Sequence, residues 1–564
     1  STAEGQALFI RAPLLYLSPG FWALRQSSAY PCDNNSVTVS VTFNVPLYAF
    51  CTPVVTVAGL AGSLTTDGTL PLTTRTVPAG SLNPDLSVNS WARTSGILTF
   101  TVTGTNDVLG ASPGTGDTVL AVDIPLINPA APQESRSVSI SASISGFAVT
   151  NTLVTSPSAG LTNTSVNATT TYSGIPPVSP TAPANDYYLW TALSTGPLSY
   201  PQPVGWAQFP LFVMPARLYT WIAQSSPFPC DSNQITIALM STIPLLPRCT
   251  PSITISGLAG TSTSADSRNI SFLGGGTASS VFNLAGSNVT AQWGGSTGVL
   301  SFSLTTVLTS FSAGSSTNVI DKILFRIAVN NPSSPDSARN LCPGGVCNDF
   351  LPTSVMATLS LVSSVGSSSA SDSNRPLYGS GTPSLYGYDA SGSSFAVAVS
   401  VFDSARSSNL ISVNRGDALP LNLRSVTINA TVTQSTSNPC ALNTLTVTFA
   451  TSSPLLLSCT TPTTLTFSGL ANSVTASNTT LSVTSSVFNS AGVWDNAGTL
   501  ILTPAAIVVA GTSYTVTFAL MNRQAAQSAR TVSILAAPFN SQAAVVTSAP
   551  ENSGPLFVSP INWT

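Results

Sequence analysis

Histidine is absent from the 564 residues, and charged side chains of any kind are scarce. They make up 7% of the chain, against roughly 25% in an average soluble protein. Without an imidazole base, a Ser-His-Asp triad and most general-base chemistry are excluded. Lys322, the single lysine, lies in the strand-like run Ile320 to Val329, which disfavours a Ser-Lys dyad. The scattered acidic residues show no pair suited to glycoside hydrolysis. We expect no enzymatic activity and no cofactor.

Long apolar runs are also missing, although the mean hydropathy is +0.32. A spanning helix needs roughly 18 uninterrupted apolar residues, whereas runs such as Ile501 to Ala510 are short and contain Thr503 and Pro504. We therefore predict no membrane span. The net charge of −3 provides no field that would attract nucleic acid. Because the chain starts at Ser1 without an initiator methionine or an apolar leader, we interpret it as a mature secreted product.

Cysteine, by contrast, follows a regular pattern. Six of the eight cysteines form three pairs with the same spacing. The pairs are Cys32 and Cys51, Cys230 and Cys249, and Cys440 and Cys459. Repeated spacing over copies that start about 200 residues apart indicates a repeat of whole domains rather than of solenoid turns.

The repeat extends on both sides of each cysteine pair. A Gln-Ser-Ser/Thr string and a proline precede the first cysteine, and a run that alternates apolar with polar residues follows it, such as Val37 to Phe43. After the second cysteine come a short strand and Gly-Leu-Ala, then a tryptophan followed by a glycine, and finally an asparagine and arginine with seven residues between them. The tryptophans are Trp91, Trp293 and Trp494, and the Asn and Arg pairs are Asn128 with Arg136, Asn331 with Arg339, and Asn522 with Arg530.

Strict alternation with β-branched residues is typical of half-buried strands, and no long helical periodicity is present. We predict an all-β fold of tandem immunoglobulin-like β-sandwich domains with long Ser/Gly/Pro-rich loops. The predicted repeat units cover residues 1–150, 212–362 and 421–564, the last with a C-terminal extension. Residues 151–211 and 363–420 are predicted to be connecting segments or long surface loops.

Even numbers of cysteines in a secreted chain predict disulfides. We expect each pair to close within its own copy, Cys32 with Cys51, Cys230 with Cys249 and Cys440 with Cys459. Pairing between copies is the alternative, and it requires distant units to touch. Cys342 and Cys347 flank a Pro-Gly-Gly-Val turn that a local bridge would lock. Zinc is disfavoured, because there is no histidine and no Cys-x-x-Cys motif.

Other polar and aromatic residues have both a structural and a functional interpretation. Asp33 with Asn35, and Asp231 with Asn233, could bind calcium, but copy three has Ala441 there, so we favour an Asx turn. A single tryptophan per sandwich is more often a core residue than a sugar-binding one. The cluster Tyr187, Tyr188 and Trp190 is the candidate for a sugar-binding or interface surface.

Asn-x-Ser/Thr sequons predict N-linked glycans. They are Asn34, Asn163, Asn167, Asn269, Asn288, Asn429, Asn478 and Asn562. The Pro-Ser-Pro stretch around residues 176–183 invites O-linked or hydroxyproline-linked sugars.

The two ends of the chain share an apolar string. Ala7 to Ile10 is followed by Pro13, and Pro555 to Val558 is followed by Pro560. One interpretation is that a terminal strand completes a neighbouring molecule by strand addition. The other is that short apolar strings recur by chance.

Together, the strings Pro-Cys-Asp-x-Asn, Cys-Thr-Pro-x-x-Thr and Gly-Leu-Ala-Gly resemble the repeat of mastigoneme-like flagellar glycoproteins of green algae, over most of the chain. The resemblance implies immunoglobulin-like domains, heavy glycosylation, and self-association into hair-like filaments on the surface of a cell or cilium around a hydroxyproline-rich axial protein. Copy three departs from the pattern at Cys440-Ala441-Leu442 and at Cys459-Thr460-Thr461-Pro462. From the repeat, the scarce charge, the sequons and this resemblance, we predict an extracellular structural filament subunit. A carbohydrate-binding adhesin of the cell wall or cell surface is the alternative.

Overall fold

The computed structural model describes most of the three repeat units. The described residues are 19–43, 47–77, 85–104, 119–143, 152–154, 210–216, 218–241, 243–271, 288–304, 322–333, 352–363, 369–379, 384–388, 394–400, 419–477, 479–539, 544–545, 547–548 and 554–560. Half of the chain is strand and 3% is helical, which confirms the all-β prediction. Within the described residues, no helix is long and apolar enough to cross a membrane.

Unit 1 is a sandwich of two antiparallel sheets, with strand orders β1-β2-β7-β4 and β5-β6-β3-β8-β9. Its strands are β1 (Pro19–Gln26), β2 (Asn34–Phe43), β3 (Val54–Ala58), β4 (Thr73–Val77), β5 (Asp85–Ala92), β6 (Ile97–Thr103), β7 (Val119–Ile127), β8 (Val138–Ser143) and β9 (Thr152–Val154), and a 3-10 turn η1 spans Ala49–Cys51. The alternating apolar residues of β2 and β3 face one another across the sandwich, and Val37, Val39 and Val55 are buried in its core. The period-two pattern thus has the predicted structural role.

Unit 2 repeats this arrangement. Its strands are β10 (Leu218–Gln224), β11 (Ser232–Ser241), β12 (Ser252–Ser256), β13 (Asp266–Ser271), β14 (Asn288–Trp293), β15 (Leu300–Ser303), β16 (Lys322–Asn330), β17 (Pro352–Val362), β18 (Ser369–Gly379), β19 (Ser384–Tyr388) and β20 (Ser394–Ser400), with 3-10 turns η4 (Pro247–Cys249) and η5 (Gly295–Thr297). Strand β18 pairs with β17 on one side and in parallel with β10 on the other, so it joins the two layers. Strands β18 to β20 lie in residues 363–420, which the composition predicts to be a connecting segment.

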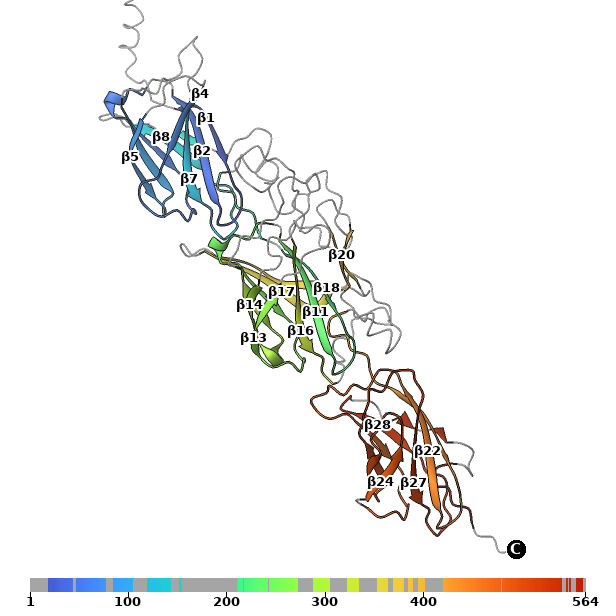
Figure 1. Cartoon of the computed structure of the whole chain (residues 1–564). Helices are drawn as coiled ribbons and strands as arrows, with labels where there is room; N and C mark the ends of the chain where they lie inside the picture. Colours follow the sequence, from blue (N-terminus) through green and yellow to red (C-terminus); the bar gives the residue numbers. More distant parts are fainter. Residues whose placement is uncertain are drawn as a thin grey trace, which may run out of the picture.

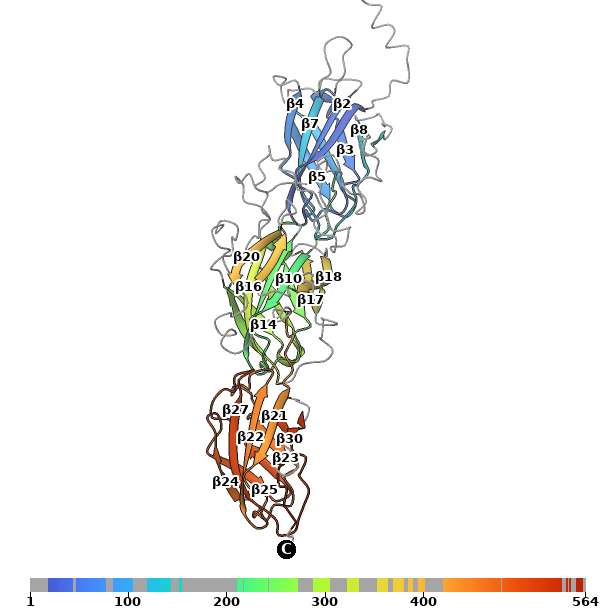
Figure 2. The same ribbon diagram turned by 90° about the vertical axis from the view of Figure 1, so that its right-hand side faces the viewer.

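Unit 3 has the same strand succession. Its strands are β21 (Ile428–Gln434), β22 (Leu442–Thr451), β23 (Thr464–Ser468), β24 (Thr479–Thr484), β25 (Ala491–Asp495), β26 (Thr499–Leu502), β27 (Tyr514–Met521), β28 (Ser533–Ala537), β29 (Ala544–Val545) and β30 (Thr547–Ser548). The three units follow one another in an elongated row, coloured from blue through green to red in Figure 1, and a quarter turn shows the same row in Figure 2.

The tryptophan and glycine of each repeat hold the second sheet together. Trp91, Trp293 and Trp494 are at most 2% exposed, as expected of core residues. Four or five residues after each tryptophan lies a glycine with a positive φ, namely Gly96, Gly298 or Gly498. A Cβ there would collide with the backbone nitrogen of the alanine in Gly-Leu-Ala. The glycine carbonyl also accepts the backbone N–H of the leucine in that motif. The two recurring motifs are therefore in direct contact, and only glycine fits at the contact.

Gly498→Ala should lower the stability of unit 3 by more than about 2 kcal/mol, because it adds a backbone collision to left-handed strain. Gly511 is the matched control, since it also has a positive φ but its Cβ would meet no atom within 4 Å. Gly511→Ala should cost only about 1 kcal/mol. Hydrogen exchange of β23 and β26 in the full chain measures both. Equal loss of protection in the two variants would contradict the contact.

Candidate functional site: the joints between units

Each unit presents its first cysteine on a loop at one end of the sandwich. We name these segments, residues 27–33, 225–231 and 435–441, the first-cysteine loops. A buried asparagine three positions after the cysteine organises each loop. Its Oδ1 accepts two backbone N–H groups of the loop, and its Nδ2 donates to the glutamine that ends the preceding strand and to a second buried asparagine. In unit 1 these residues are Asn35, Gln26 and Asn128.

The second asparagine closes the loop from the opposite side. Asn128 donates from Nδ2 to the carbonyl oxygens of Ser28 and Tyr30, at 3.1 and 2.9 Å. The same hydrogen bonds are formed around Asn233 and Asn331 in unit 2 and around Asn443 and Asn522 in unit 3. Buried polar groups are costly unless they are paired, so this network fixes the loop in one conformation.

The network holds the first cysteine in a left-handed backbone conformation. The φ angles are +57° at Cys32, +62° at Cys230 and +56° at Cys440. Such angles are uncommon for residues other than glycine. The N–H of each of these cysteines is bonded to a carbonyl beyond the network asparagine, at Pro129, Pro332 and Arg523 respectively. The backbone of the first cysteine is therefore the same in all three units.

In units 1 and 2, the aspartate after the first cysteine accepts hydrogen bonds that stabilise the first-cysteine loop. Asp33 accepts the backbone N–H of Asn34 through Oδ1 at 2.8 Å and the hydroxyl of Ser28 through Oδ2 at 2.6 Å. Asp231 makes the equivalent bonds in unit 2. These contacts agree with the favoured Asx-type interpretation. Among the residues that the structure describes, no group of three or more Cys, Asp or Glu is placed to hold a metal ion.

The second cysteine lies on a tight turn at the other end of the unit. We name residues 48–52, 246–250 and 456–460 the second-cysteine turns. In units 1 and 2 they form η1 and η4, followed by a threonine in the left-handed region. Cys51 and Cys249 donate their backbone N–H to Tyr48 and Leu246 in the same manner, at 3.0 and 2.9 Å. Unit 3 has no 3-10 turn there, at the point where its sequence carries an additional threonine.

The disulfides join different units, so the prediction of pairing within each copy is wrong. Cys32 bonds to Cys249, with Cα atoms 5.7 Å apart, and Cys230 bonds to Cys459, with Cα atoms 4.8 Å apart. Cys51 and Cys440 are free. The reason is geometric. A ten-residue strand such as β2 separates the two cysteines of a unit by about 30 Å, whereas bonded cysteines need Cα atoms within about 7 Å.

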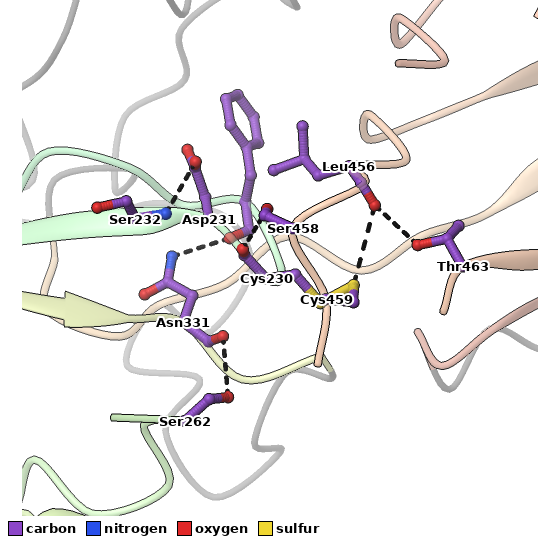
Figure 3. Close-up of a disulfide and its surroundings, with 10 residues drawn as sticks. Cys230, Asp231, Ser232, Ser262, Asn331, Leu456, Ser458, Cys459 and Thr463 are labelled. Atoms are coloured by element: carbon purple, nitrogen blue, oxygen red, sulfur yellow. Dashed lines mark hydrogen bonds between the residues drawn. A yellow bond between two sulfur atoms is a disulfide. The ribbon is translucent and has the colours of Figure 1, made fainter. Parts of the chain in front are cut away.

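Polar contacts accompany each disulfide. At the first joint, Nη1 of Arg248 donates to Oδ1 of Asn34 at 2.7 Å. At the second joint, the hydroxyl of Ser458 donates to the carbonyl oxygen of Cys230 at 2.6 Å (Figure 3). Arg248 and Ser458 both immediately precede the second cysteine. This position therefore contacts the preceding unit at or close to its first cysteine at both joints.

The hydrophobic core also continues across the joints. Ala29, Tyr30, Cys32 and Leu64 of unit 1 belong to the same buried cluster as the core of unit 2. Cys230 of unit 2 is part of the buried cluster of unit 3. The first-cysteine loop of unit 1 is thus packed into the core of unit 2, whereas at the second joint Cys230 itself is the loop residue that joins the core of unit 3.

A Pro-Leu segment after each unit docks back onto that unit. In the first, Leu211 and Phe212 accept from the side-chain amides of Gln133 and Gln26, and Val213 pairs with Gln133. Residues 420–424 and 555–558 make corresponding contacts on units 2 and 3. Strand β10 begins three residues after 215, so this docking fixes where the next unit starts. Pro555 to Val558 packs on its own unit, and Ala7 to Ile10 lies outside the described residues.

The structure places the remaining candidate residues only in part. Asn34 and Asn429 are exposed, and Asn269 and Asn288 lie in β13 and β14. The other candidates lie outside the described residues. They are Asn163, Asn167, Asn478, Asn562, Cys342, Cys347, Arg339, Tyr187, Tyr188 and Trp190.

A hollow of about 480 Å³ in unit 2 is a surface depression to consider as a ligand site. It is lined by Ser252, Val289, Thr290, Gln292, Ser301, Phe302 and Ser303. Phe302 is only 4% exposed, so its ring offers no face for a sugar to stack on. The joints are therefore the more informative sites.

Comparison with known proteins gives no family assignment. No family model and no curated protein matches the chain. The C-terminal domain of the Streptococcus pyogenes antigen I/II-family protein AspA is 8% identical, with a TM-score of 0.20, over 60% of this chain and 99% of that one. The partial N-terminal region of an enterococcal surface protein is also 8% identical, with a TM-score of 0.18, over 64% and 95%. At this level of similarity, neither function nor partners can be transferred to this chain.

Peptide mapping of the unreduced protein should recover the linked peptides Cys32–Cys249 and Cys230–Cys459, because these are the bonded pairs among the six cysteines that the structure describes. Protease digestion followed by mass spectrometry, with alkylation before any reduction, makes the measurement. Cys51 and Cys440 in monomeric protein should be alkylated. A Cys32–Cys51 peptide would contradict the structure.

Asn443→Ala should destabilise unit 3 by about 3 kcal/mol, because it leaves several buried donors and acceptors unpaired. Asn429 is the control, since it is an exposed asparagine at β21 of the same unit. Asn429→Ala should change stability by no more than about 0.5 kcal/mol. Urea unfolding followed by hydrogen exchange in unit 3 peptides compares them. A small effect of Asn443→Ala would show that the network does not hold the loop.

Proposed function

We propose that this protein is a structural subunit of an extracellular filament, built from tandem sandwich units whose relative positions are fixed. The observation that carries the proposal is the joint, where a disulfide connects successive units and its first cysteine is buried in the core of the next unit. Disulfides are typical of proteins that mature in oxidising compartments, which supports an extracellular location. No role in the proposal falls to a catalytic group, a cofactor or a metal.

We extend this proposal to the type of filament, its glycans and its axial partner, as the sequence suggests them. The filament would be a mastigoneme-like hair or a glycofibril, decorated with glycans at exposed sequons such as Asn429 and associated with a hydroxyproline-rich axial partner. Scarce surface charge supports this, because a chain with little charge repulsion readily associates with itself. The adhesin alternative predicts exposed aromatic side chains. The hollow in unit 2 has none, because Phe302 is buried, and the exposed pair Tyr48 and Phe50 on unit 1 is the aromatic surface that an adhesin would use.

Electron microscopy of the unreduced protein over a concentration series tests the filament function. We expect ordered fibres with a regular repeat that reflects the row of units. A variant with Cys230→Ser and Cys459→Ser keeps each sandwich but loses one joint disulfide, and it should give irregular or fewer fibres. Dispersed particles at every concentration, together with binding of the protein to a glycan array, would support the adhesin instead.

A further inference from the structure

Both joints follow one rule, by which the first cysteine of a unit bonds to the second cysteine of the next unit. Among the three units that the structure describes, the loop of unit 3 and the turn of unit 1 are left without such a partner, and their cysteines, Cys440 and Cys51, are free. We propose that Cys440 of one molecule forms a disulfide with Cys51 of a second copy, so that chains join head to tail through a third joint of the same kind. This inference rests on the proposed filament function and names its covalent link.

The two free cysteines already have the backbone conformations that the bonded cysteines use. Cys440 has φ +56°, beside +57° and +62° at Cys32 and Cys230. Cys51 ends a 3-10 turn like that of Cys249, and the following Thr52 and Thr250 are both left-handed, with φ +45° and +37°. One free residue is thus of the loop type and the other of the turn type. No rearrangement of either backbone is needed for bonding.

The end of unit 3 exposes apolar side chains that unit 1 buries under its neighbour. Val474 is 55% exposed, whereas Leu64 at the same place in the repeat is 1% exposed and belongs to the core cluster of unit 2. Met521 is 41% exposed, whereas its counterpart Ile127 packs against that cluster. In unit 2 the same two positions are the polar residues Ser262 and Asn330, which stay exposed beside the second joint. The apolar residues of unit 3 therefore correspond to those of the first joint, where they are covered, and an exposed apolar patch of this kind indicates an interface. Its occupant at the covered joint is a second-cysteine turn and the unit that bears it.

The opposite end, at unit 1, carries a matching apolar surface. Phe50 is 81% exposed and Tyr48 is 44% exposed, with ring centroids 5.5 Å apart. Phe50 occupies the position of Arg248 and Ser458, which contact the preceding unit at the internal joints. Covering a phenylalanine with this exposure would be favourable by roughly 1.5–3 kcal/mol.

The clearest sign of complementarity is the residue pair that meets at the first joint. There Arg248 of the turn bonds to Asn34 of the loop side. The same two positions at the open ends are Phe50 and Leu442, and Leu442 is 65% exposed. The polar pair Arg248 and Asn34 of the first joint thus corresponds to an apolar pair at the open ends, with one apolar residue on the turn and one next to the loop. Superimposing the first joint on the open ends would bring these two residues together.

Further exchanges would make the third joint selective. The loop of unit 3 has Asn438 where units 1 and 2 have the buried aromatics Tyr30 and Phe228, and it has Ala441 in place of the aspartate. At the proposed joint the aromatic residues would thus be on the turn of unit 1, as Tyr48 and Phe50, and not on the loop of unit 3. Because a loop-to-turn contact uses two different surfaces, it does not close into a symmetric dimer and can continue indefinitely when its geometry forms no ring.

Forming the link oxidises two thiols and requires a disulfide-class oxidant. With oxidised glutathione, the Cys440 thiolate attacks one glutathione sulfur and releases one glutathione thiolate. The Cys51 thiolate of the second copy then attacks the Cys440 sulfur and releases the other. Two protons and two electrons leave the cysteine pair, and one glutathione disulfide becomes two glutathiones.

Complementary single variants of the full chain test the pairing. Of the two free thiols Cys51 and Cys440, the variant Cys51→Ser retains the one on the loop and Cys440→Ser retains the one on the turn, and one of the variants is labelled with ¹⁵N. In a glutathione redox buffer, an equal mixture should give a disulfide-linked dimer whose Cys440–Cys51 peptide combines one labelled and one unlabelled half. Wild-type protein should give a ladder of longer multimers, which is lost on reduction. Like-with-like peptides, or links only through Cys342 or Cys347, would overturn the proposal.

A matched pair of valine variants tests whether the apolar ends guide the reaction. Val474 and Val493 are both exposed valines of unit 3, at 55% and 64%, but only Val474 lies in the position that the first joint covers. Val474→Ser should slow multimer formation several-fold, and Val493→Ser should leave the rate unchanged. Equal rates would mean that the thiols meet by random collision, which overturns the third joint.

The double variant Cys51→Ser/Cys440→Ser separates this inference from the filament function. It should still be folded, because neither thiol is bonded within the chain. If wild-type protein forms fibres without the Cys440–Cys51 peptide, and the double variant forms the same fibres, the filament function stands and the covalent link fails. If neither protein forms fibres or multimers under oxidising conditions, both proposals fail.

Discussion

The ten-residue strand between the two cysteines of each unit is the constraint on which the architecture depends. A strand of that length places its ends much farther apart than a disulfide can reach. Each unit therefore cannot satisfy its own cysteines, and it offers one at each end. The units must be stacked for the bonds to form, so the covalent chemistry and the linear arrangement are consequences of the same strand.

The buried amide network explains why three diverged sequences keep one kind of joint. It fixes the first-cysteine loop through buried glutamine and asparagine side chains that bond to one another within each unit. The contact residues are then free to vary, as Arg248 and Ser458 show. The separation between a constant internal frame and a variable surface allows different joints to be built from the same loop geometry.

Much of the fold could be predicted from the sequence, because alternating apolar residues and buried tryptophans follow directly from side-chain burial. The alternating run at Val37 to Val41 and the core position of Trp494 are confirmed. The disulfide partners were predicted wrongly, although the strand that forbids the bond from Cys32 to Cys51 was itself predicted. Asn35, Asn233 and Asn443 were not recognised as a network, even though an asparagine three residues after each first cysteine was the available signal.

Other features depended on contacts that no local pattern encodes. In the sequence, the apolar string is conspicuous only near the chain ends, and the docking of the Pro-Leu segments depends on side-chain amides far away in sequence, such as that of Gln26, which donates to Phe212. The continuity of the core across a joint is likewise a property of two units together. The family resemblance and the predicted glycosylation remain predictions from the sequence.

Each joint is crossed twice by covalent bonds, once by the backbone after the docked Pro-Leu segment and once by the disulfide. Two attachment points resist rotation of one unit about the other, whereas a single covalent connection would allow it. A pull along the row is also divided between both paths, so a sandwich can be loaded through its two ends without its strands being peeled apart one by one. The molecule is therefore suited to transmit torque and tension along the row of units.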